Sequence, residues 1–112
     1  MQFSGHAPTG REVVQYERAG AWVVVAHGDY DRHSVAAMAD ALETAAGKHS
    51  RVVLDAAGLA FADSTFLNLL LRTHQTTSLC VVSPNPQLRR ILEITGADTV
   101  LDVRATVEDA VT

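Results

Sequence analysis

The sequence predicts a single α/β domain built on a mixed, mostly parallel β-sheet with about four α-helices. Valine-rich runs alternate along the chain with segments whose apolar residues recur at helical spacing, which is the pattern of parallel strands joined by crossover helices. Two apolar runs near the N-terminus are so close that they should form an antiparallel hairpin at one edge of the sheet. The length of 112 residues suits one domain.

The hairpin is the first predicted element. We expect strands at Glu12–Glu17 and Ala21–Ala26, with a turn at Gly20 between them. Residues 1–11 are predicted to form a flexible N-terminal arm, so the folded domain should extend over residues 12–112.

A helix with one buried face should follow the hairpin. Ser34 can cap its start and Gly47 can end it. The apolar residues that recur at helical spacing on this face are Val35, Met38, Ala39, Leu42, Ala45 and Ala46.

The rest of the chain is predicted to alternate between strand and helix. The spacing of Thr106 and Asp109 resembles a capping box and indicates one more helix start near the C-terminus. In chain order we expect strand Arg51–Asp55, helix Ser64–Gln75, strand Leu79–Ser83, helix Asn85–Thr95 closed by Gly96, strand Val100–Val103 and a helix from Thr106.

Composition and charge narrow the range of functions. A net charge of −4 with scattered basic residues argues against a nucleic-acid surface. Cys80 is the only cysteine, so the chain cannot form an internal disulfide, which suits the reducing cytoplasm. Because it lies in an apolar run, it should pack as a small core residue. Because no stretch is long and apolar enough for a membrane span and the start lacks the features of a signal peptide, we expect a cytoplasmic protein.

The predicted helix Ser64–Gln75 is not simply amphipathic. Its first two turns are surrounded by the large apolar residues Phe66, Leu67, Leu69, Leu70 and Leu71. This helix is either buried on most sides or retains an exposed apolar patch on which a partner docks.

The junction between this helix and the preceding strand is the most informative segment. Asp63, Ser64 and Thr65 stand where a helix begins, and aspartate and serine are preferred caps for unpaired backbone N–H groups. The same position would favour an added phosphate, because the positive end of the helix dipole lies there. Capping and phosphorylation are both consistent with the motif.

The segment from Asp55 to Leu67 resembles a segment of the STAS domain, the fold of bacterial anti-sigma factor antagonists. The family segment has the form D-L-S-G-(V/L)-x-F-(M/L)-D-S-(S/T)-G-(L/V). The residues that match it in register are Asp55, Gly58, Leu59, Phe61, Asp63, Ser64, Thr65 and Leu67. By this resemblance the phosphoacceptor falls on Thr65, with Ser64 as the less favoured neighbour.

Of the residues that depart from the family segment, two stand out. Ala57 replaces a serine, and Phe66 replaces the small glycine that follows the phosphoacceptor. Upstream, Gly28-Asp29-Tyr30-Asp31 resembles the family's G-(E/D)-(L/I)-D turn. The resemblance as a whole covers nearly the entire chain, from the predicted strand near Val13 to the predicted helix near Val107.

The resemblance implies an anti-sigma factor antagonist that is not itself an enzyme. It would bind an anti-sigma factor with serine/threonine kinase activity, be switched off by phosphorylation at Thr65 and be restored by a protein phosphatase, so that it regulates transcription. We expect no cofactor, no metal, no nucleic acid and no membrane among its ligands, and a monomer or weak homodimer. The expected partner-binding residues are Asp29, Tyr30, Asp31, Asp63, Ser64, Thr65, Phe66 and Asn68.

Two other functions remain open. The chain could be a STAS subunit that is never phosphorylated and docks on another protein, such as a transporter ATPase. A receiver-like domain with a phosphate-accepting Asp55 is the remote alternative, since Asp29 and Asp31 resemble its acidic pair, but the sole lysine, Lys48, lies in the wrong loop. No histidine pair with metal-ligand spacing and no glycine-rich phosphate loop supports an enzyme.

Overall fold

The computed structural model describes residues 13–30 and 35–111, which form one five-stranded sheet. The strands are β1 (Gln15–Arg18), β2 (Ala21–Asp29), β3 (Arg51–Phe61), β4 (Ser78–Val82) and β5 (Asp102–Arg104). Their order across the sheet is β1-β2-β3-β4-β5. β1 runs antiparallel to β2, whereas every other neighbouring pair is parallel. The predicted mixed sheet with a hairpin edge is therefore confirmed.

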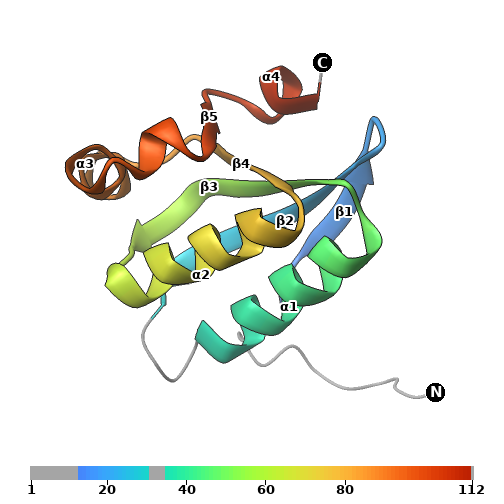
Figure 1. Cartoon of the computed structure of the whole chain (residues 1–112), viewed down its shortest axis with the longest axis horizontal. Coiled ribbons are helices and arrows are strands. Elements are labelled where there is room, and N and C mark those ends of the chain that lie inside the picture. The colour runs from blue at the N-terminus through green and yellow to red at the C-terminus, as the bar shows by residue number, and fades with distance from the viewer. Residues whose placement is uncertain (1–12, 31–34, 112) are drawn as a thin grey trace.

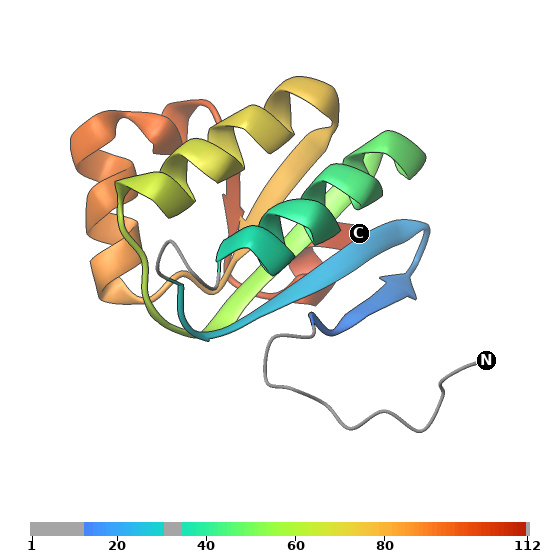
Figure 2. The same ribbon diagram turned by 90° about the horizontal axis from the view of Figure 1, so that it is seen from below.

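Helices cover the two faces of the sheet unequally. α1 (Val35–Lys48) and α2 (Ser64–Thr76) lie side by side on one face, with α3 (Pro86–Thr95) beyond α2, as Figures 1 and 2 show. The short α4 (Val107–Val111) lies on the opposite face (Figure 1). Within the described residues, no helix is long and apolar enough to cross a bilayer.

The larger core lies between the sheet and helices α1, α2 and α3. Its largest fully buried side chains are Phe66, Met38, Leu42, Leu54, Leu70, Leu79, Leu88 and Leu92. Four of the five large apolar residues in the first turns of α2 are buried, and Leu71 is half-buried. This burial follows from the position of α2 between two other helices (Figure 2). Of the two possibilities that the sequence left open for this helix, burial is correct and an exposed apolar patch is wrong.

The central strands are longer than the sequence predicts. β2 continues past Ala26 to Asp29 and β3 past Asp55 to Phe61, where the sequence pattern indicated loops. Pairing persists with two shifts in register, and Gly28 has a positive φ of 75° between them. Gly58 allows the strands to approach here, because a Cβ atom at this position would lie 3.2 Å from the carbonyl oxygen of Ala26.

Several other predicted ends also move. Gly47 does not end the first helix but lies within it, because the chain remains helical to Lys48. The last strand begins at Asp102, later than predicted, since residues 97–99 form a 3₁₀ turn. β1 begins at Gln15, and both Glu12 and the predicted cap Ser34 lie outside the described residues.

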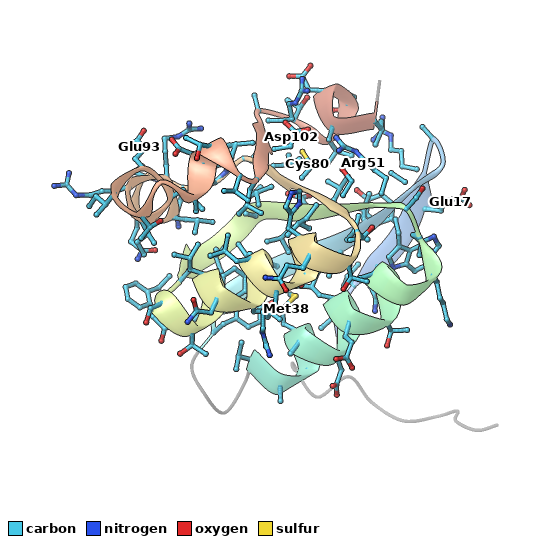
Figure 3. All side chains as sticks on the ribbon, viewed as in Figure 1. Glu17, Met38, Arg51, Cys80, Glu93 and Asp102 are labelled. Atoms are coloured by element: carbon cyan, nitrogen blue, oxygen red, sulfur yellow. The ribbon has the colours of Figure 1, made fainter. Side chains whose placement is uncertain are left out.

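α4 covers part of the second face of the sheet, above a small cluster of buried apolar residues. Charged side chains hold it there. Arg51 donates hydrogen bonds to the Asp102 carboxylate at 3.1 Å and to the Ala110 carbonyl oxygen at 2.9 Å. The three labelled side chains Arg51, Asp102 and Cys80 lie near α4 in Figure 3. Burial, together with the charge of Asp102, raises the pKa of the Cys80 thiol to about 11. Cys80 is thus a core residue, as predicted.

The hairpin turn offers a test of backbone strain. Ala19 and Gly20 both have positive φ angles, 52° and 85°, as a type I′ turn requires, and alanine is disfavoured there. Ala19→Asn should therefore raise the free energy of unfolding by about 1 kcal/mol, measured by urea denaturation. Gly20→Ala is the matched control and should lower it. A stability loss in Ala19→Asn would contradict the assigned turn geometry.

Candidate functional site

The candidate site lies where the carboxyl ends of β2 and β3 meet the first turn of α2. Asp29 at the end of β2 is paired in register with Phe61 at the end of β3. Asp63 follows two residues later and precedes Ser64, the first residue of α2. The two segments that the sequence singled out, far apart in the chain, therefore meet at one edge of the sheet. Asp31 lies outside the described residues.

Asp63 is the N-cap of α2. Its backbone is extended, and its carboxylate accepts a hydrogen bond of 3.1 Å from the backbone N–H of Phe66. Its carbonyl oxygen accepts the first helical hydrogen bond, from the N–H of Leu67 at 3.0 Å. The predicted capping role is confirmed.

The residues that open α2 present their polar side chains to solvent. Ser64, Thr65 and Asn68 are all exposed, and Asp63 is half-buried. A hydroxyl in this first turn faces the positive end of the helix dipole. Chemically, the arrangement suits a hydroxyl that another protein can reach and to which a dianionic group can be added without an unfavourable interaction with the helix.

Phe66 does not lie on the surface where the sequence placed it as a partner contact. Its side chain is fully buried, and the ring stacks on that of Tyr30, with centroids 5.3 Å apart. The Tyr30 hydroxyl oxygen in turn accepts a hydrogen bond from the N–H of His27 at 3.0 Å. The reason is positional: Phe66 is the third residue of α2, on the side that faces the sheet. Tyr30 and Phe66 therefore join the end of β2 to α2.

Asn85 and Gln87 at the start of α3 hold the end of β3 and the residue that follows it. The Asn85 side-chain amide donates to the carbonyl oxygens of Leu59 at 2.7 Å and Ala60 at 3.2 Å. Gln87 bonds Ala62 twice, accepting from its N–H at 3.0 Å and donating to its carbonyl oxygen at 2.6 Å. We call these four hydrogen bonds the Asn85–Gln87 clasp.

The sequence indicated a helix start at Asn85 but not the clasp. Asn85 is indeed the N-cap of α3, and its side-chain oxygen accepts from the N–H of Leu88 at 2.8 Å. Pro86 is the first helical residue, a position that suits proline because its N–H would have no helical partner there. Asparagine before proline predicts a cap, but no local pattern predicts a bond to residues far upstream.

No metal centre is found in the described part of the chain. Within residues 13–30 and 35–111, no group of three or more His, Cys, Asp or Glu side chains is placed to hold an ion. The strand order also differs from that of receiver domains, which have the order 2-1-3-4-5 in an all-parallel sheet. The receiver-like alternative is therefore wrong.

Comparison with known proteins identifies the family. A family model described as "Mlab, STAS domain" matches residues 14–103. The chain belongs to the STAS domain family. The match covers every strand except the last residue of β5, together with α1, α2 and α3. No curated protein matches this STAS domain.

Solved structures agree with this assignment. An anti-sigma factor antagonist from Mycobacterium paratuberculosis is 26% identical, with a TM-score of 0.80 over 88% of each chain. An anti-sigma factor antagonist (STAS) domain protein from Planctomyces limnophilus is 21% identical, with a TM-score of 0.77 over 89% of this chain and 95% of that one. The Bacillus cell fate determinant SpoIIAA in its phosphorylated form is 20% identical, with a TM-score of 0.70 over 88% and 96%. The fold is thus that of anti-sigma factor antagonists.

Removal of the α2 cap should destabilise the domain. Asp63→Ala leaves the N–H of Phe66 without its acceptor and should lower the free energy of unfolding by about 0.5–2 kcal/mol, measured by chemical denaturation. Asp63→Asn retains an acceptor oxygen and should lose less. An unchanged stability in Asp63→Ala would contradict the capping role.

Truncation of Phe66 should cost more than loss of the cap. Phe66→Ala creates a cavity under the first turn of α2 and removes the stack on Tyr30, so we expect a loss of about 3–5 kcal/mol in the same measurement. Phe66→Leu, which retains apolar volume, serves as the control and should lose less. A loss in Phe66→Ala as small as that of a surface substitution, within about 0.5 kcal/mol, would show that the ring is not buried.

Proposed function

We propose that this STAS domain is an anti-sigma factor antagonist that binds an anti-sigma factor with serine/threonine kinase activity and is switched off when that partner phosphorylates Thr65. The observation that carries the proposal is the exposed hydroxyl of Thr65 on a first helical turn whose preceding backbone is held by the Asn85–Gln87 clasp. A kinase needs a substrate hydroxyl that it can enclose, and this hydroxyl requires no local unfolding to be reached.

The position of Thr65 also explains how one phosphate could act as a switch. The first-turn location makes the added charge of roughly −1.5 to −2 tolerable to the domain, because the N-terminal end of α2 is electropositive. The partner, in contrast, has no electropositive helix end to offset the added phosphate charge. To bind again it would have to bury a dianion beside the carboxylate of Asp63, which adds like charge. Phosphorylation would thus weaken the complex while the free domain stays folded.

The proposed binding surface is the polar rim around this hydroxyl. Its residues are Asp29, Asp63, Ser64, Thr65 and Asn68, with Tyr30 half-buried beneath them and Asp31 following in sequence. Phe66 is removed from the surface that the sequence predicted, because its ring belongs to the core. The likeness to the phosphorylated form of SpoIIAA supports phosphorylation on this fold, and a separate phosphatase would reset the switch.

Two observations favour a second function. Phe66 stands where antagonists usually carry glycine, and the matching family model bears the description "Mlab, STAS domain" instead of the name of an antagonist. On this alternative the domain is a docking subunit of another complex, such as a transporter ATPase, and Thr65 is never phosphorylated. Phosphorylation assays separate the two functions.

The phosphorylation site is testable by mass spectrometry. We expect the wild type, incubated with Mg²⁺, ATP and each purified anti-sigma kinase of the source genome, to gain one phosphate on Thr65. Thr65→Ala should abolish it, whereas the matched control Ser64→Ala should retain it. Thr65→Glu should weaken binding of the same kinase in a calorimetric titration, because it places a carboxylate in the interface.

Phosphate on Ser64 in the Thr65→Ala variant would reassign the acceptor. No labelling by any of these kinases, together with equal binding of wild type and Thr65→Glu to whichever kinase binds, would contradict the switch. The docking subunit would then be the better interpretation.

A further inference from the structure

Phe61 is a large apolar side chain that the core does not use. It is 51% exposed, although it ends a strand whose residues Val52, Val53 and Leu54 are fully buried. The neighbouring core positions are filled by Leu59 and Ala62, which are 3% and 0% exposed. The ring therefore remains at the surface, and its removal leaves the core packing in place.

The backbone that carries Phe61 is fixed on both sides. The Asn85 amide bonds the carbonyl oxygens of Leu59 and Ala60 before it, and Gln87 bonds both backbone groups of Ala62 after it. In addition, Phe61 is paired in register with Asp29 of β2. A contact residue on a backbone that is already ordered loses little conformational freedom when a partner binds.

The surroundings of Phe61 are polar and contain the proposed phosphorylation site. Ser64 and Thr65 follow it within four residues, and both are exposed, as is Asp29 beside it. A standard interface engages about 20–30 residues of each partner, so an interface centred on Thr65 extends over Phe61. Aromatic anchors set in a polar rim are the usual sites of high binding energy in such interfaces.

We propose that Phe61 is the aromatic anchor by which this domain binds the kinase that phosphorylates Thr65, its ring entering an apolar pocket of that kinase. The proposal rests on the proposed function. It replaces the anchor that the sequence suggested, because Phe66 is buried and Phe61 is exposed. The same ring would contact the kinase before and after phosphate transfer, so it should govern binding and leave the chemical step unchanged.

The test is a calorimetric titration of the full chain with the kinase that labels Thr65, loaded with ADP so that no phosphate is transferred. Phe61→Ala should weaken binding about tenfold or more. The matched control is Ile94→Ala on α3, which removes a side chain that is 73% exposed and outside the proposed interface; it should bind as the wild type does. Phe61→Leu retains apolar bulk and should lose no more than about threefold, and it serves if Phe61→Ala fails to fold.

Kinetics give an independent readout. In the phosphorylation assay Phe61→Ala should raise KM for this domain with little change in kcat, because the ring contributes to binding and not to transfer of the phosphoryl group. A fall in kcat at unchanged KM would overturn the anchor, since it would mean that Phe61 orients Thr65 instead.

The remaining outcomes separate the two proposals. If Phe61→Ala binds as the wild type does while Thr65→Glu binds less, the anchor is wrong and the proposed function stands. If no kinase binds or labels the wild type, the proposed function fails and the anchor fails with it. If Phe61→Ala abolishes self-association in sedimentation but leaves kinase binding intact, the ring contacts a second copy of the chain and the anchor is again wrong.

Discussion

The hydrogen bonds between the start of α3 and the backbone around the end of β3 are the interaction on which the candidate site depends. Pairing of β3 with β4 ends at Asp55, so the backbone groups that face away from β2 beyond this point need other partners. Asn85 and Gln87 supply them through side-chain amides. Because Asn85 also caps α3, one residue sets the end of β3 and the start of α3 together. The direction in which α2 begins follows from this arrangement.

On the other side, an aromatic contact holds the same turn. Tyr30 stacks on Phe66 and is itself bound to the backbone of His27, so the end of β2 and the first turn of α2 are joined through two rings. Together with the Asn85–Gln87 clasp, this contact secures the turn from both flanks. In the proposed switch, a phosphate on Thr65 would therefore change the charge of a surface whose shape stays the same, and its effect would fall on the partner.

The sequence predicted the features that depend on local patterns and failed where distant residues decide. Valine-rich runs predicted the strands of the sheet, and apolar residues at helical spacing predicted the helices. The cap at Asp63 followed from the residue type at a helix start. Phe66 was wrongly assigned to the partner-binding surface, because the family motif aligns it with a small glycine, whereas its ring packs into the core between the sheet and the helices. The clasp could not be predicted, since Gln87 and Ala62 are separated by a whole helix and a strand.

The order of strands in the sheet equals their order in the chain. Each new strand therefore joins the edge left by the one before it, and none has to insert between two strands that are already paired. The first pair needs only the turn at Ala19 and Gly20, and each later strand emerges after the helix that crosses to it. During synthesis the sheet can grow from the N-terminal hairpin one strand at a time, with β1 as one constant edge and the most recently made strand as the edge to which the next strand adds.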